Sequence, residues 1–260
     1  MGHRLLGKLP QTRNWKKVIA LLSATDDPAA IARETSKAAS RGLNLAKSDP
    51  GVIDAVYTLI STTLAANKSD FQSALEEIGI SIPKEASLLD VVGAFNKTLD
   101  QDMLRRGHRS DLAEMARQAA VETLTEMCSK ETGSLFGVTM KDTQQTLKKY
   151  STPTNFGLLG ESFFGKFLFR FLDYHLSREL PNHIGSKKQF QSIRDCQIFK
   201  EALNLHCLQT ARIVREFSGG WQSSTEYHEG VTRNNVGTKF VPVAFKKITD
   251  ELKLRGGAND

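Results

Sequence analysis

The segment at residues 160–167, GESFFGKF, has the glycine and lysine spacing of a phosphate-binding P-loop. In that motif the lysine is followed by Ser or Thr, whose hydroxyl binds magnesium, whereas Lys166 is followed by Phe167. A P-loop also follows a strand, and the residues before this segment include Pro153 and Gly157, which disfavour a strand. We interpret the match as part of an aromatic helix and predict no cofactor.

Histidine, cysteine and acidic residues are concentrated between residues 173 and 207. His175 and Glu179 are four residues apart, so on a helix they would share one face, as metal ligands do. No C-x-x-C or H-x-x-x-H pair is present, and we predict neither a metal site nor a Cys–His nucleophile. An acid–base site around His175 stays open as an enzymatic alternative, because a carboxylate could orient that imidazole. The group comprises Asp173, His175, Glu179, His183, Cys196, His206 and Cys207.

Pairs of lysines recur in the second half of the chain. Basic pairs at helix ends can contact phosphates while the fold stays packed, and such binding weakens steeply with salt. The alternative interpretation is an ordinary solvated surface. Nucleic-acid binding is therefore an alternative functional hypothesis, assigned to Lys148, Lys149, Lys187, Lys188, Arg194, Lys246 and Lys247.

Residues 218–239 are rich in glycine, serine and asparagine, and they are expected to be the most irregular part of the chain. The pair Gly219-Gly220 is expected to end the helix before it. Exposed aromatic side chains in such a loop can anchor a partner protein, although Trp221 could instead fasten the loop to the core. We assign Trp221 and Tyr227 as candidate partner-binding residues.

The elements that would position these residues are predicted to be helices. Asp27-Pro28 and Asp49-Pro50 each combine a capping carboxylate with a proline at the first helical position. Ser69 and Ser87 read as further N-caps, and sustained strand alternation is absent. The sequence predicts an all-α fold, a multi-helix bundle of about ten helices, with two helical subdomains left open. Its expected helices include an aromatic one over residues 163–180 and a long one over residues 189–217.

Charge and aromatic content divide the chain into two regions. Residues 1–133 contain 17 basic and 17 acidic side chains, whereas residues 134–260 contain 18 and 12, so the net charge of +6 belongs to the second region. The first region has four aromatic residues and the second has 16. We predict a charge-balanced helical region over 1–133 and a basic, aromatic-rich helical region over 134–260, with a joint near Gly133 to Thr139.

Composition excludes several classes of protein. With 40% hydrophobic and 25% charged residues, the chain has an ordinary globular composition, and three cysteines cannot form a disulfide framework. No run of 18 apolar residues is present, and the N-terminus lacks the apolar segment of a secretory signal. We expect a cytoplasmic protein without a membrane partner.

No set of candidate catalytic residues is complete, while basic and aromatic residues gather in one half. These two observations favour a non-enzymatic interaction protein that contacts protein partners through its second half. An all-helical Met-Gly chain of this kind resembles accessory subunits of bacterial multi-gene systems, including anti-phage operons. The resemblance implies an accessory subunit of a larger assembly.

Overall fold

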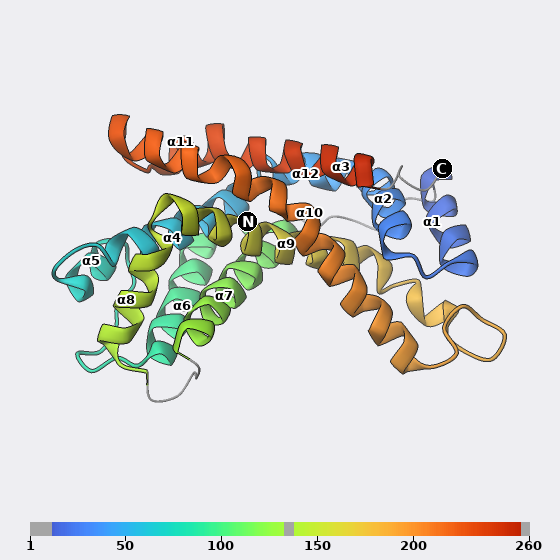
Figure 1. Ribbon diagram of the computed structural model, residues 1–260, viewed down its shortest axis with the longest axis horizontal. Coiled ribbons are helices and arrows are strands. Elements are labelled where there is room, and N and C mark those ends of the chain that lie inside the picture. The colour runs from blue at the N-terminus through green and yellow to red at the C-terminus, as the bar shows by residue number, and fades with distance from the viewer. Residues whose placement is uncertain (1–11, 133–137, 256–260) are drawn as a thin grey trace.

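The computed structural model describes residues 12–132 and 138–255, and within these ranges the chain is helical and contains no strand (Figure 1). The prediction of an all-α multi-helix bundle is confirmed. No helix in the described ranges is both long enough and apolar enough to cross a membrane. The elements are α1 (Arg13–Ala24), α2 (Pro28–Ala38), α3 (Ser40–Ala46), α4 (Pro50–Ala65), α5 (Phe71–Glu77), α6 (Leu88–Arg106), α7 (Asp111–Thr132), α8 (Met140–Tyr150), α9 (Pro153–Leu176), the 3₁₀ turn η1 (Leu180–His183), α10 (Ile193–His228), α11 (Arg233–Asn235), the π-helical turn η2 (Val236–Phe240) and α12 (Val241–Arg255).

The antiparallel helices α9 and α10 run through the middle of the molecule, and the other helices form two arms beside them (Figure 1). Helices α4 to α8 form one arm, while α1 and α2 form the other with the far ends of α9 and α10. The run from α11 through η2 to α12 bridges the arms, because η2 packs against α4 and α12 packs against α2 and α3.

Side-chain caps define where several helices begin. Asp27 and Asp49 accept hydrogen bonds from the first backbone N–H groups of α2 and α4, as predicted. Ser87 caps α6 as predicted, in a reciprocal capping box with Asp90. The expected cap at Ser69 is wrong: Asp70 caps α5, and its carboxylate accepts from both the backbone N–H and the hydroxyl of Ser73.

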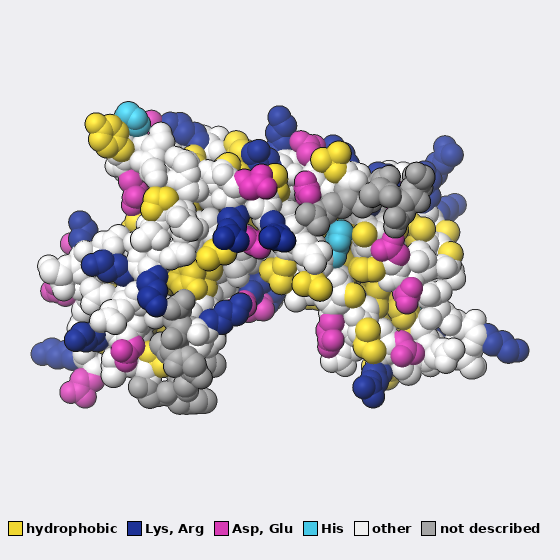
Figure 2. Space-filling view, viewed as in Figure 1, with side chains coloured by type: hydrophobic (Ala, Val, Ile, Leu, Met, Phe, Trp, Pro, Cys, Tyr) yellow, Lys and Arg dark blue, Asp and Glu magenta, His cyan; other side chains and the backbone are white. Residues whose placement is uncertain are grey.

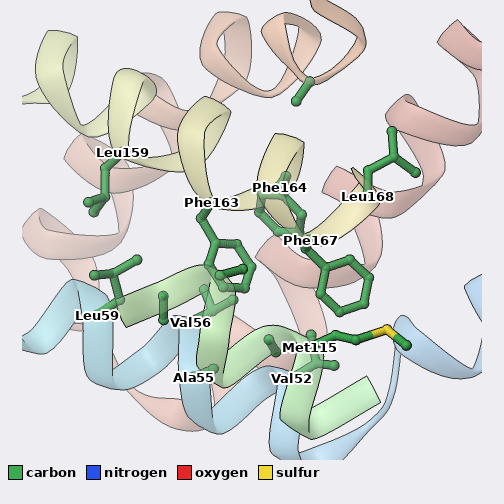
Figure 3. Packing of buried hydrophobic residues seen from close by; sticks show 14 of the residues in the cluster. Val52, Ala55, Val56, Leu59, Met115, Leu159, Phe163, Phe164, Phe167 and Leu168 are labelled. Atoms are coloured by element: carbon green, nitrogen blue, oxygen red, sulfur yellow. The ribbon is translucent and has the colours of Figure 1, made fainter. Parts of the chain in front are cut away.

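The core is centred on the contact between α4, α7 and α9 (Figure 3). Val52, Ala55, Val56 and Leu59 of α4 face the phenylalanines of α9, and all are buried (Figure 3). The rings of Phe163 and Phe164 are 5.0 Å apart and meet edge to face, an arrangement favoured by aromatic quadrupoles. The aromatic residues of the second region therefore build a core that it shares with α4 of the first.

Two predicted helix boundaries are wrong for one tertiary reason. α9 begins at Pro153 rather than at residue 163, and α10 continues through Gly219 and Gly220 to His228. A Cβ on Gly219 would lie 2.6 Å from the Pro153 carbonyl oxygen, and a Cβ on Gly157 would lie 2.9 Å from the Arg215 carbonyl oxygen. These glycines permit close helix packing, so they do not mark loops.

The predicted joint between the two regions falls largely on residues 133–137, which lie outside the described residues. On either side of it, helices of both regions pack together: α2 contacts α9, α10 and α12, and α7 contacts α8 and α9. The division at 133/134 stays a prediction.

Candidate functional site

His175 lies near the C-terminal end of α9, and its imidazole is buried against two aromatic rings. The ring centroids of Phe171 and Tyr174 are 5.0 and 5.3 Å from that of His175. Neither ring nitrogen has a hydrogen-bond partner among the described residues, and burial lowers the pKa of His175 to about 4. Because α9 ends at Leu176, Glu179 does not share its helical face. The structure therefore provides no described carboxylate to orient His175 as a base.

The other members of the predicted His/Cys group do not form a ligand set. Within residues 12–132 and 138–255, no three His, Cys, Asp or Glu side chains are placed to hold a metal ion. His183 lies instead 3.4 Å from the Ser23 hydroxyl, and Asp173 pairs with Lys200 at 2.7 Å. Cys196 and Cys207 are buried, and burial raises the pKa of both thiols.

The P-loop-like segment lies inside α9, so its backbone N–H groups are not arranged to cradle a phosphate. Its lysine, Lys166, is buried and pairs with Glu126 of α7, while the Ser162 hydroxyl lies 3.2 Å from the ammonium. Burial favours a higher pKa for Glu126, but hydrogen bonds from Lys130 and Lys166 outweigh it and lower that pKa. Lys166 thus joins two helices.

The candidate nucleic-acid-binding residues lie on separate parts of the molecule. Lys148 and Lys149 end α8, whereas Lys187 and Lys188 lie in the loop before α10. These two places are at opposite ends of the view in Figure 1. Arg194 is in the first turn of α10, and Lys246 and Lys247 lie on α12, where the Lys247 ammonium is 5.6 Å from the Phe217 ring centroid. Lys and Arg side chains are also dispersed over the face shown in Figure 2.

The two candidate partner-binding aromatics differ in their surroundings. Trp221 is half-buried, and its ring centroid lies 4.5 Å from that of Phe240 and 6.0 Å from that of Phe156. Tyr227 is 85% exposed in the last turn of α10. Residues 218–228 of the expected irregular stretch are instead helical, so Trp221 and Tyr227 both lie on α10, six residues apart. Tyr227 is available to a partner, whereas Trp221 also fastens α10 to the core.

The outward side of α10 carries aliphatic residues that no described element covers. Ile198 and Leu205 are 55% and 57% exposed, and a separation of seven residues places them on one helical face. Arg194, Glu201 and Arg212 are exposed around them. We call these five residues the α10 outer face.

A second feature surrounds a buried carboxylate in α4. Asp54 is buried, and His108 Nδ1 lies 2.7 Å from one of its oxygens while the Arg233 guanidinium pairs with the other. A carboxylate only accepts, so Nδ1 carries the hydrogen of this bond. Arg233 also lies over the Tyr57 ring, 5.4 Å from its centroid. These contacts fix the start of α11 against α4.

Beside this cluster is a groove of about 690 Å³, within the size range of ligand pockets. We call it the α4 groove, since Tyr57, Thr58 and Ser61 of α4 line it. Residues at the C-terminal ends of α5 and α6, together with Arg233, also line it. Its lining residues are Tyr57, Thr58, Ser61, Glu76, Glu77, Ile78, Gly79, Thr98, Gln101, Asp102, Leu104, Arg105, Arg106 and Arg233.

A cleft of about 540 Å³ between α7, α9 and α10 differs from this groove, because the charges that line it are paired. Arg170 pairs with Glu122 at 2.6 Å, and the Tyr174 hydroxyl lies 3.0 Å from Asp111. These pairs join α7 to α9. We interpret this cleft as a contact between helices and not as a binding site.

No role was predicted from the sequence for the residues of the α4 groove. One signal was present: Asp54 is an acid within the apolar pattern of Val52, Val56 and Leu59, and a buried acid requires a partner. Its partners, His108 and Arg233, are 54 and 179 residues away in the sequence, so only the fold identifies them.

Comparison with protein-family models, with curated proteins and with solved structures finds no match to this chain.

Proposed function

We propose that this protein is a non-enzymatic interaction subunit that binds a protein partner through the α10 outer face. The observation that carries the proposal is the exposure of Ile198 and Leu205, two large aliphatic side chains on one helical face. Aliphatic residues at the centre of a charged rim are typical of protein interfaces. The face belongs to the basic, aromatic-rich region.

The partner element that fits this surface best is an amphipathic helix. Ile198 and Leu205 are about 10 Å apart along the axis of α10, which is two helical turns. A helix lying alongside would offer aliphatic residues at the same period. The rim carries charges of both signs, Arg194 and Arg212 with Glu201, so it would determine register and specificity more than affinity.

Nucleic-acid binding is the alternative that the same experiment decides. The basic residues assigned to it lie on α8, on the loop before α10, on α10 and on α12. A phosphate backbone is usually bound by one continuous basic patch, and these dispersed residues support such binding less well. A cytoplasmic assembly, as in the accessory subunits of multi-gene systems, remains part of the proposal.

The test compares two double variants with matched exposure. In Ile198→Ser with Leu205→Ser, two exposed side chains of α10 are truncated; in Leu45→Ser with Leu89→Ser, two comparably exposed side chains elsewhere are truncated. Each chain carries an internal tag and is purified natively from its source cell, and the eluate is analysed by mass spectrometry and by absorbance for nucleic acid.

We expect the wild type and the control to retain one stoichiometric protein, and the α10 variant to lose it by at least about tenfold in affinity. Thermal unfolding of both variants should resemble that of the wild type, because the side chains are exposed. A partner that stays bound to the α10 variant, or a chain that emerges alone, overturns the proposal.

Nucleic acid in a protein-free eluate also overturns it and supports the alternative. In that case Lys187→Glu with Lys188→Glu should weaken binding to every sequence and reduce the salt dependence. The partner-binding role of Tyr227 is tested by Tyr227→Ala alone, since Trp221→Ala would also remove core contacts with Phe156 and Phe240.

A further inference from the structure

The exposed stripe of α10 that contains the α10 outer face has the same residue spacing in both directions from Leu205. Steps of four, three and four residues lead back from Leu205 to Arg194 and forward to Glu216. All the side chains of the stripe are exposed, and at about 100° per residue they lie within one sector of the helix. In chain order they are Arg194, Ile198, Glu201, Leu205, Gln209, Arg212 and Glu216.

The charged side chains of this stripe make no ion pair with a described residue, whereas the neighbouring Lys200 pairs with Asp173 at 2.7 Å. Their charges are therefore available to another molecule. Because opposite charges must meet for two such surfaces to fit, the order of the charges along the stripe limits which partner can bind. That order is Arg194, Glu201, Arg212, Glu216.

This order fits a second copy of α10 that runs antiparallel to the first. With a two-fold axis beside Leu205, each residue faces the residue that lies equally far from Leu205 in the other copy. Leu205 then packs against the partner's Leu205, and Arg194 lies opposite Glu216 of the partner subunit. By symmetry this ion pair forms twice.

The positions between the centre and the ends are compatible with the same arrangement. Ile198 faces the partner's Arg212, whose methylene groups can cover an aliphatic side chain while its guanidinium stays in water. Glu201 faces the partner's Gln209, whose amide N–H groups can donate to a carboxylate. No like charges meet in this register.

Two other arrangements of the same helices bring like charges together. A parallel pair would set Arg194 against the partner's Arg194. An antiparallel pair shifted to set Ile198 against the partner's Leu205 would bring the two Glu201 carboxylates together near the axis. Repulsion between like charges disfavours both arrangements.

We propose that two copies of this protein pair through antiparallel α10 helices, with the two-fold axis beside Leu205, and that this pairing occludes the α10 outer face. The inference rests on the proposed function for one point only, that a partner protein uses this face; a bound copy then excludes that partner. The contact involves about 33 Å of one helix, so the pairing should be weak and should depend on concentration.

The first experiment is sedimentation velocity of the purified full-length chain, from micromolar to millimolar concentration and at two ionic strengths. We expect a reversible equilibrium between monomer and dimer, which added salt weakens because the ion pairs are at the surface. A chain that stays monomeric at every concentration overturns the proposal.

Charge reversal tests the pairing of Arg194 with Glu216 of the partner subunit. Arg194→Glu should weaken the dimer by at least about tenfold, because both ion pairs become repulsive. Adding Glu216→Arg to that variant should restore most of the affinity, because opposite charges then meet again. The control Arg41→Glu reverses an exposed charge on α3 and should leave the dimer unchanged. A double variant as weak as the single one, or a control that weakens the dimer equally, overturns the proposal.

Cysteine variants test the register of the two helices. Leu205→Cys should form a disulfide between two chains in oxidised glutathione, because residue 205 faces its own copy. Ile198→Cys is the matched control: the exposed fractions of residues 198 and 205 are 55% and 57%, but residue 198 would lie about 20 Å from its own copy along the helix axis. Equal cross-linking of both variants, or of neither, contradicts this register.

Two measurements separate this inference from the proposed function. A purified chain that is always monomeric, with a partner retained in the native purification, overturns the pairing and leaves the proposed function intact. A chain that pairs but retains no partner has the opposite meaning. Exclusion is tested in a source cell that makes the chain with two different tags: material captured through one tag with the partner should lack the other tag, and a complex containing both tags and the partner overturns exclusion.

Discussion

Burial keeps the His175 imidazole from acting as an acid or a base. Its imidazole lies between the rings of Phe171 and Tyr174, and neither nitrogen has a described partner. Burial disfavours the charged form, which is why the pKa falls to about 4. The folded state therefore holds this histidine neutral over a range in which the unfolded chain would protonate it.

Protonation of His175 should make the protein less stable as the pH falls. The unfolded state, with an ordinary histidine pKa near 6.5, binds the proton first, so stability is fully present above about pH 6.5 and decreases towards pH 4. The contribution is about 1.4 kcal/mol per pH unit. We expect His175→Phe to be at least as stable at pH 7 and to remove this part of the pH dependence, measured by chemical denaturation at pH 7 and pH 5.

If His175→Phe retains the slope of the wild type, or destabilises the protein at pH 7, then the imidazole nitrogens have partners that stabilise the fold.

At the scale of the element, α9 and α10 approach closely because glycines face the other helix. On α10, Gly219 lies against the backbone of Pro153, whereas a Cβ on the next residue, Gly220, would meet no atom within 4 Å. Two neighbouring glycines in one helix thus differ only in what their missing side chains would touch.

These neighbours should respond to alanine with opposite signs. Gly219→Ala pushes a Cβ against a carbonyl oxygen that cannot rotate away, and we expect a loss of about 1–3 kcal/mol. Gly220→Ala adds a better helix former in open space, and we expect a gain of about 0.5–1 kcal/mol. Guanidinium unfolding of both variants measures the difference. Equal effects would mean that the contact between α9 and α10 does not constrain Gly219.

The same glycines explain which elements could be predicted from the sequence. The start of a helix could be predicted where a side chain caps backbone N–H groups two or three residues further on, as at Asp27, Asp49 and Ser87. The pair Gly219-Gly220 carries the local signal of a helix stop, but the packing of Gly219 against Pro153 overrides it. Periodicity likewise identified a helix containing Ile198 and Leu205, but not that other helices leave this face uncovered.

For the candidate sites, the sequence indicated individual chemical groups but not which of them meet. Asp54 and Arg233 are far apart in the chain, and their pairing depends on how α11 docks on α4. In contrast, the adjacent lysines assigned to nucleic acid are visible as sequence patterns, and the fold distributes them over several helices.

At the scale of the whole molecule, one hydrophobic cluster joins helices of both sequence regions. It includes Val18 of α1, Val56 of α4, Phe163 of α9 and Ile248 of α12. Much of the aromatic excess of the second region belongs to α9, which places Phe156, Phe163, Phe164, Phe167 and Phe171 in this common core. Removing either region would expose the apolar surface of the other.

We therefore expect the protein to unfold in one cooperative transition. Scanning calorimetry should give a calorimetric enthalpy equal to the van't Hoff enthalpy, as for a single cooperative unit. Two resolved transitions would instead support the predicted division at 133/134 into two helical subdomains.

The π-helical turn at residues 236–240 gives the molecule a sensitivity to chain length as well as to side-chain identity. A π-turn contains one residue more than an α-helical turn, so this segment has one residue more than a continuous α-helix would have. Deleting one residue there would restore the α-helical count and rotate Arg233 by about 100° relative to α12. The arginine would then leave Asp54 and Tyr57, and the α4 groove would lose one of its lining side chains although every lining residue was still encoded.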